Sequence, residues 1–165
     1  MTWENPPASR RAQILHSTRT VAMVGASPNP ARASNFVATY LLASSDFDVY
    51  FVNPNATEVL GHPVYKTLDE LPVVPDLVDV FRRRSDLPAV LDDVLALGSV
   101  EMGAVKTIWF QFGLFDEQVA RRAEAAGLNV VMDRCLKVEH ARFHGGLHLA
   151  GFNTGVISAR RRRTP

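Results

Sequence analysis

The chain has 165 residues, of which 47% are hydrophobic and 21% are charged, so it can bury one hydrophobic core and is not disordered as a whole. This length leaves no room for a second catalytic domain. A formal net charge of +1 at pH 7 gives no general attraction to nucleic acid or acidic membranes. We therefore expect neither a nucleic-acid partner nor a membrane partner.

Cysteine usage and the N-terminal segment bear on the compartment. The single cysteine, Cys135, cannot form an internal disulfide, so nothing requires an oxidising environment. Residues 1–20 lack the continuous apolar segment of a signal peptide, and no other run is long enough to span a bilayer. We expect a cytoplasmic protein.

Short apolar runs alternate with helical patterns along the chain. Each run fits a strand buried on both faces, and five are predicted, at residues 20–24, 48–52, 77–81, 107–110 and 129–132. The alternation indicates an α/β fold: a Rossmann-like, doubly wound parallel sheet of about five strands, with helices on both faces. Numbered along the chain, these strands are expected in the order 3-2-1-4-5.

Serine residues mark the starts of two predicted helices. Ser34 is the predicted N-cap of a helix over residues 35–43, with Phe36 on its apolar face. Ser85 is the predicted cap of a later helix, which Gly98 ends.

The remaining segments are less regular. A small edge hairpin is predicted at residues 59–60 and 64–65, followed by one helical turn at 67–71. Another helix is expected to begin near Asp116 and to end at Ala126.

The predicted domain occupies residues 20–140. Residues 1–19 are an N-terminal extension, and residues 141–165 are a C-terminal extension with a basic tail, interpreted as solvated. A helix is predicted over residues 136–143, at the junction with this tail.

Polar, small or cationic residues follow every predicted strand. In an open parallel sheet, ligands bind outside the carboxyl ends of the strands, where the strand order reverses. The five strand ends should therefore form one crevice. They are Gly25-Ala26-Ser27, Asn53-Pro54, Phe81-Arg82-Arg83, Gln111-Phe112-Gly113 and Asp133-Arg134-Cys135.

The loop after the first strand has the chemistry of a phosphate site. Gly25 allows a sharp turn and a close approach of the backbone, and Ser27 offers a hydroxyl group. Arg32 carries a guanidinium group suited to phosphate oxygens, and the helix that follows Ser34 presents free N–H groups to an anion. An ordinary strand–helix turn with capping residues is the alternative reading of this loop.

Other nucleotide sites fit the sequence poorly. The first loop lacks the third glycine of Gly-x-Gly-x-x-Gly, and Asn53 stands where an NAD site needs a carboxylate. No Gly-Lys-Ser/Thr follows a predicted strand, which disfavours a nucleotide triphosphatase.

Six ordered segments carry a resemblance to a known family. They are GASPNPARAS (25–34), VNP (52–54), VLGHPVYKTLDELP (59–72), VDVFRR (78–83), WFQFG (109–113) and AGLNVVMDRCLKVEH (126–140). Together they resemble the small bacterial CoA-binding proteins, a family related to the CoA-binding domain of succinyl-CoA synthetase. The resemblance covers about residues 20–140. It implies a Rossmann-like fold that binds coenzyme A or an acyl-CoA and has no established reaction of its own.

The resemblance implies roles that agree with the residue chemistry. Coenzyme A carries a pyrophosphate and a 3′-phosphate, so several cations should converge on it. The residues expected to bind it are Gly25, Ala26, Ser27, Arg32 and Ser34 at the pyrophosphate, Asn53 and Pro54 at the adenosine, Phe81, Arg82 and Arg83 at the next strand end, and Gln111, Gly113 and Cys135 toward the pantetheine arm. A solvated basic run is the alternative for residues 82–84.

Other reactive residues are given structural roles. Cys135 is interpreted either as a packed thiol or as a partner for a mixed disulfide with coenzyme A. His140, His144 and His148 have helical spacing, but Gly145-Gly146 should break the helix, so a metal site is disfavoured. Asp76, Asp79 and Asp133 are interpreted as caps or salt-bridge partners.

The sequence therefore predicts a module that binds coenzyme A, without a catalytic constellation. Two alternatives remain open: an NAD(P)-binding or other nucleotide-binding regulatory domain, and an enzyme related to CoA-dependent transferases or ligases. The sequence names no protein partner, and a homo-oligomer is left open.

Overall fold

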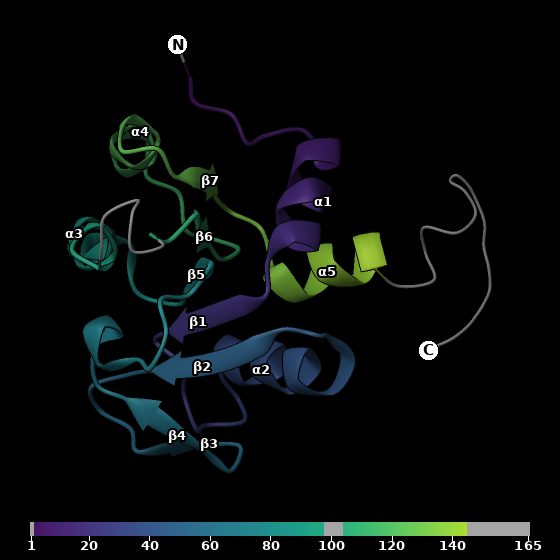
Figure 1. Ribbon diagram of the computed structural model, residues 1–165, viewed down its shortest axis with the longest axis vertical. Coiled ribbons are helices and arrows are strands. Elements are labelled where there is room, and N and C mark those ends of the chain that lie inside the picture. Colours follow the sequence, from purple (N-terminus) through teal and green to yellow (C-terminus); the bar gives the residue numbers. More distant parts are fainter. Residues whose placement is uncertain (1, 98–103, 145–165) are drawn as a thin grey trace.

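The computed structural model describes residues 2–97 and 104–144 (Figure 1). Seven strands of this part form one sheet in the order β3-β4-β2-β1-β5-β6-β7. Every neighbouring pair is parallel except β3 with β4. The strands are β1 (Thr20–Val24), β2 (Asp48–Val52), β3 (Glu58–Val59), β4 (His62–Tyr65), β5 (Leu77–Val80), β6 (Thr107–Phe110) and β7 (Asn129–Val131).

Helices cover both faces of the sheet, as predicted for a doubly wound fold. Figure 1 shows α3 and α4 on one side, with α1, α2 and α5 on the other. The helices are α1 (Ala8–Ser17), α2 (Ala33–Ser44), α3 (Leu87–Leu95), α4 (Glu117–Ala125) and α5 (Leu136–His144), with 3₁₀ turns η1 (Leu68–Glu70) and η2 (Arg84–Asp86). The predicted α/β class is confirmed.

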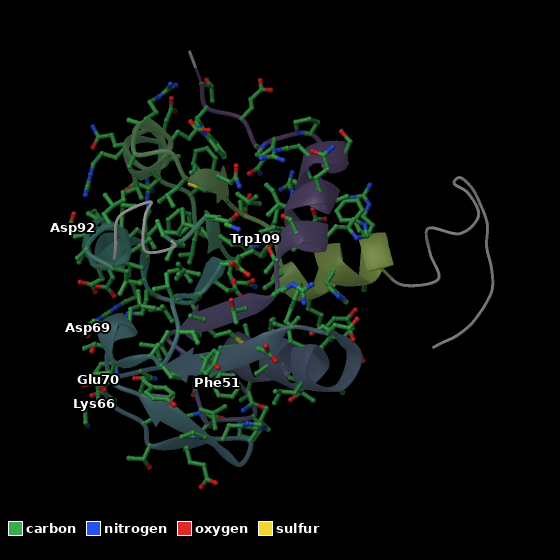
Figure 2. All side chains as sticks on the ribbon, in the orientation of Figure 1. Phe51, Lys66, Asp69, Glu70, Asp92 and Trp109 are labelled. Carbon is green, nitrogen blue, oxygen red and sulfur yellow. The ribbon has the colours of Figure 1, made fainter. Side chains whose placement is uncertain are left out.

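The central strands are continuous apolar runs because both of their faces are buried. The four residues of β5 and the four of β6 are all buried. Trp109 on β6 and Phe51 on β2 are the largest fully buried side chains, and both pack on the face covered by α1, α2 and α5 (Figure 2).

The predicted strand order was wrong in one place. It put residues 77–81 outside residues 48–52, but β5 pairs with β1, from Val21 with Leu77 to Val24 with Val80. The outer position belongs to β4, which pairs in parallel with β2. The hairpin predicted for this segment is present as β3 and β4. Its second strand joins the main sheet, which its short and proline-containing sequence did not indicate.

Two predicted helix caps were also wrong. Ser34 is the second residue of α2, because the helix begins at Ala33 with Arg32 as its N-cap. The Ser34 hydroxyl instead accepts a hydrogen bond from the N–H of Ser27. Ser85 lies in η2, and α3 begins two residues later, with a proline in its first turn as proline's fixed φ favours. Gly98, the predicted end of that helix, lies outside the described residues.

Other local predictions were confirmed. The turn expected at 67–71 is η1, and the helix expected at 136–143 is α5. The side chain of Asp116 caps α4 by accepting a hydrogen bond from the N–H of Val119 at 3.1 Å.

The predicted N-terminal extension contains a helix that the sequence pattern did not reveal. Ile14 and Leu15 of α1 are buried against the sheet. Arg11 of the same helix forms a buried ion pair with Glu139 of α5. Because a buried charge needs a partner, this ion pair holds α1 against α5, the helix that follows β7.

Candidate functional site

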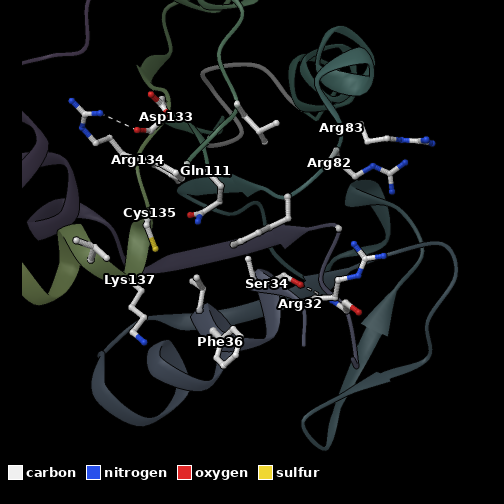
Figure 3. A pocket seen from close by; sticks show the side chains of 18 of the residues that line it. Arg32, Ser34, Phe36, Arg82, Arg83, Gln111, Asp133, Arg134, Cys135 and Lys137 are labelled. Atoms are coloured by element: carbon white, nitrogen blue, oxygen red, sulfur yellow. Dashed lines mark hydrogen bonds between the residues drawn. The ribbon is translucent and has the colours of Figure 1, made fainter. Parts of the chain in front are cut away.

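A cavity of about 1200 Å³ opens at the carboxyl ends of the parallel strands (Figure 3). This is the edge at which the sequence predicted a ligand. Ten of the thirteen predicted site residues line it. From the first loop and α2 these are Gly25, Ser27, Arg32 and Ser34. From the other strand ends they are Asn53, Phe81, Arg82, Arg83, Gln111 and Cys135.

Three predicted site residues do not line the cavity. Ala26 is fully buried in the core beneath α2. Pro54 does not line the cavity, whereas its neighbour Asn55 does. The N–H of Gly113 donates to the carboxylate of Asp133 at 2.7 Å and is not directed at a ligand.

The loop after β1 requires glycine at its first position. Gly25 has a φ of +89°, and a Cβ placed on it would lie 2.6 Å from the backbone oxygen of Phe81. Only a residue without a side chain fits, so the backbone at the end of β1 packs directly against the end of β5.

The first turn of α2 fastens the rest of this loop. Ser27 donates its N–H to the Ser34 hydroxyl at 3.0 Å and accepts the Asn35 amide at its carbonyl at 3.0 Å. The Ser27 hydroxyl accepts the N–H of Asn29 at 3.1 Å. Both hydroxyl groups act as acceptors here, so their O–H hydrogens are available to an anion. Ala33 also lines the cavity, which places the positive end of the helix dipole there.

Asn53 braces two loops. Its amide nitrogen donates to the carbonyl of Ala26 at 2.8 Å, and its amide oxygen accepts the N–H of Asn55 at 2.9 Å. Both ends of this amide are engaged within the protein. Asn53 therefore shapes the edge of the cavity beside β2, where the sequence predicted an adenosine contact.

Three arginine side chains gather on one side of the cavity, as Figure 3 shows for Arg32, Arg82 and Arg83. Arg82 and Arg83 both lie near Asp86, with N–O distances of 3.6 and 3.9 Å. Arg32 is exposed and forms no ion pair with the residues that the structure describes. This side therefore carries a net positive charge.

The opposite side is formed by the start of α5, with Cys135 and Lys137 (Figure 3). Gln111 at the end of β6 fixes this helix, because its side-chain oxygen accepts the N–H of Leu136 at 2.9 Å. The Lys137 ammonium lies 5.8 Å from the centre of the Tyr40 ring, a cation–π arrangement. Cys135 is partly exposed.

Several lining residues were not predicted as site residues. Arg134 belongs to a predicted strand end but was given no contact with the ligand. Lys137 lies two residues after Cys135, and its position after β7 could have indicated it. Phe112 also belongs to a predicted strand end and was given no contact with the ligand, whereas Phe36 and Val138 were not predicted at the crevice. All three are apolar yet exposed. Phe36 was assigned to the buried face of its helix and instead projects outward.

The carboxylates behave differently from one another. Asp76 accepts hydrogen bonds from the N–H groups of Arg19 and Thr20, and Asp133 from that of Gly113, so their predicted structural roles are confirmed. The prediction for Asp79 was wrong. It is fully buried within β5, and neither of its oxygens accepts a hydrogen bond from a described residue.

Among the three histidines of this pattern, the structure describes the side chain of His140 alone. His140 shares a hydrogen bond of 2.8 Å with the Tyr40 hydroxyl through Nδ1. His148 lies outside the described residues. No group of three or more His, Cys, Asp or Glu side chains that could hold a metal occurs in residues 2–97 and 104–144. In the same part of the chain, no helix is long and apolar enough to cross a membrane.

Known proteins resemble this chain over most of its length. Residues 19–141 match the family model of the CoA binding domain. Protein YneT of Bacillus subtilis (strain 168) is 32% identical over 138 residues, which cover 84% of this chain and 97% of that protein. The crystal structure of Prb, a PH1109 protein redesigned for binding, is 34% identical with a TM-score of 0.77, and the match covers 87% of this chain and 96% of that one.

A larger protein contains a similar unit. The dinucleotide forming acetyl-coenzyme A synthetase 1 of Ca. Korarchaeum cryptofilum is 25% identical with a TM-score of 0.60. The match covers 72% of this chain but only 26% of that one. The resemblance carried by the six sequence segments is confirmed, and the chain belongs to the CoA binding domain family.

Proposed function

We propose that this chain binds coenzyme A, or an acyl-CoA, in the cavity at the carboxyl ends of the strands. The observation that carries the proposal is the convergence of Arg32, Arg82 and Arg83 with the start of α2 on one side of that cavity. Coenzyme A has more phosphate charge than one helix N-terminus would balance. Three guanidinium groups at one place suit such a ligand.

The roles of the residues follow from their positions. The loop from Gly25 to Ser34 holds the pyrophosphate, with the Ser27 and Ser34 hydroxyl groups and Arg32 as donors. Arg82 and Arg83 serve the remaining phosphate, and Asn53 borders the adenosine. The pantetheine arm then runs past Phe81 and Gln111 toward Cys135, on the side opposite the arginines.

The proposal is tested by ligand choice. We expect coenzyme A to raise the melting temperature of the full chain more than NAD does at equal concentration, because a ligand stabilises the folded state by mass action. A thermal-shift panel of CoA, acetyl-CoA, NAD, NADP, FAD and ATP gives the ranking, and titration calorimetry then gives the affinities. NAD binding as tightly as CoA would refute the proposal in favour of a dinucleotide-binding domain.

Cys135 gives a chemical test of where the pantetheine arm ends. If the CoA sulfur reaches this side of the cavity, the Cys135 thiolate can attack the S–S bond of CoA disulfide. A Cys135–S–S–CoA bond then forms, and one CoA thiolate leaves. Mass spectrometry should detect one CoA-sized adduct, and its position is unambiguous because the sequence contains one cysteine.

Two controls define the result. Cys135→Ser should give no adduct, and glutathione disulfide at the same concentration should modify the wild type much less, because it lacks the nucleotide that the arginines bind. The absence of a CoA adduct under conditions where CoA is bound would show that the arm ends elsewhere.

A further inference from the structure

Three large apolar side chains around the cavity are exposed to solvent. Phe36 is 58% exposed, Phe112 is 78% exposed and Val138 is 57% exposed. They belong to seven exposed large hydrophobic residues in the described part of the chain, and all three line this one cavity. Exposed apolar groups gathered around a concavity are typical of surfaces that a ligand or partner covers.

The three residues come from separate parts of the fold. Phe36 lies in the first turns of α2, Phe112 follows β6, and Val138 lies in the first turn of α5. Val138 lines the cavity from α5, the helix whose start forms the side opposite the arginines. Figure 3 shows Phe36 below the space between these two sides. All three therefore line the cavity through which the proposed pantetheine arm passes.

We infer that the site is built for acyl-CoA with an apolar acyl chain, and that Phe36, Phe112 and Val138 cover this chain. The inference rests on the proposed function, because it assigns the phosphates to the arginine side. One ligand then matches both halves of the cavity. Its anionic end meets the guanidinium groups, and its apolar end removes exposed apolar surface from water.

The size of the cavity supports this assignment. Small-molecule sites usually have volumes of about 300–1,000 Å³. The cavity of about 1200 Å³ exceeds that range, as a ligand as large as an acyl-CoA requires.

The experiment compares four ligands by titration calorimetry on the full chain, with a reductant present: CoA, acetyl-CoA, octanoyl-CoA and succinyl-CoA. Octanoyl-CoA should bind at least tenfold more tightly than CoA, and acetyl-CoA should lie close to CoA. The readout for variants is the ratio of the CoA dissociation constant to that of octanoyl-CoA. Phe36→Ala and Phe112→Ala should each lower this ratio at least threefold. Leu95→Ala removes an exposed apolar side chain outside the cavity and should leave the ratio unchanged.

The outcomes separate this inference from the proposed function. If no CoA ligand binds, the proposed function itself fails. If CoA binds but octanoyl-CoA binds no better, or succinyl-CoA binds best through Lys137 or Arg134, the inference alone is overturned. It is also overturned if Phe36→Ala and Phe112→Ala leave the ratio unchanged but lower the molar mass measured by light scattering. The apolar groups would then contact a second copy of the chain.

Discussion

Arg32→Ala is expected to weaken CoA binding by roughly tenfold to hundredfold, and Arg82→Ala to a similar extent. Each replacement removes a charge-assisted hydrogen bond to a phosphate, worth about 1.5–3 kcal/mol. The effect on folding should be small for Arg32, because its side chain is exposed and forms no ion pair with a described residue. Titration calorimetry gives the affinities, and urea unfolding gives the stabilities.

Arg84→Ala is the matched control for these variants. Arg84 belongs to the same run of three arginines and is exposed, but it does not line the cavity. Its loss changes the net charge by the same amount, so it measures the general electrostatic contribution. If Arg84→Ala weakens CoA binding equally, the arginines act through their general positive charge and not through direct contacts with the phosphates. Unchanged affinity in both Arg32→Ala and Arg82→Ala would show that the phosphates are held elsewhere.

The strands were predictable because burial on both faces requires a continuous run of apolar residues. All five predicted runs are strands of the sheet, with ends within one residue of those predicted. The order was harder, because pairing depends on contacts between segments far apart in the chain. The parallel pairing of β4 with β2 involves only two residue pairs, Phe51 with Val64 and Val52 with Tyr65. Such a short edge strand has little pattern of its own.

The site was predictable where it depends on topology. Parallel strands bring their carboxyl ends together, and this rule alone found half of the residues that line the cavity. The rule could not show which polar side chains at the strand ends form hydrogen bonds within the protein. The amide of Asn53 is occupied by Ala26 and Asn55, which only the folded loops reveal. The exposure of Phe36 was equally hidden, since it depends on where α2 meets the rest of the fold.

The environment of Asp79 in the core was also not predictable from the sequence. It was interpreted as a cap or salt-bridge partner, although it is the middle residue of the predicted strand 77–81. In the structure it stands beside Met23 of β1 and Trp109 of β6, which are both fully buried. Burial raises the pKa of Asp79 well above its ordinary value of 3.8. A buried carboxyl group without a hydrogen-bond partner is far less costly when protonated and neutral.

Asp76, three residues earlier, has the opposite behaviour. Its partial burial would raise the pKa. Hydrogen bonds from the N–H groups of Arg19 and Thr20 and from the Thr20 hydroxyl, together with the charge of Lys106, lower it below 3.8 instead. The two carboxyl groups therefore contribute to stability in opposite ranges of pH, and each serves as a control for the other.

Asp79→Asn should become more stable than the wild type as the pH rises. Below the unfolded-state pKa of about 3.8, both states of the wild type hold the Asp79 proton, so the variant differs little there. Above it, the unfolded chain releases this proton while the folded chain retains it. Wild-type stability then falls by up to about 1.4 kcal/mol per pH unit, until the raised folded-state pKa is reached. Asparagine has no carboxyl proton to release, so the stability of the variant does not fall in this way.

Urea unfolding at pH 2.5, 3.5, 5.5, 7 and 8, followed by the fluorescence of Trp3 and Trp109, measures this difference. Asp76→Asn should show the reverse. Its loss of stability at pH 7 should shrink only below pH 3.8, as the pH falls toward the lowered folded-state pKa, because a carboxylate with a lowered pKa stabilises the folded state only while it is ionised. If Asp79→Asn follows the wild type in parallel at every pH, or is less stable at pH 7, then Asp79 is ionised in the folded protein. Its charge would then have a partner, and β5 would need a polar contact that none of the described residues supplies.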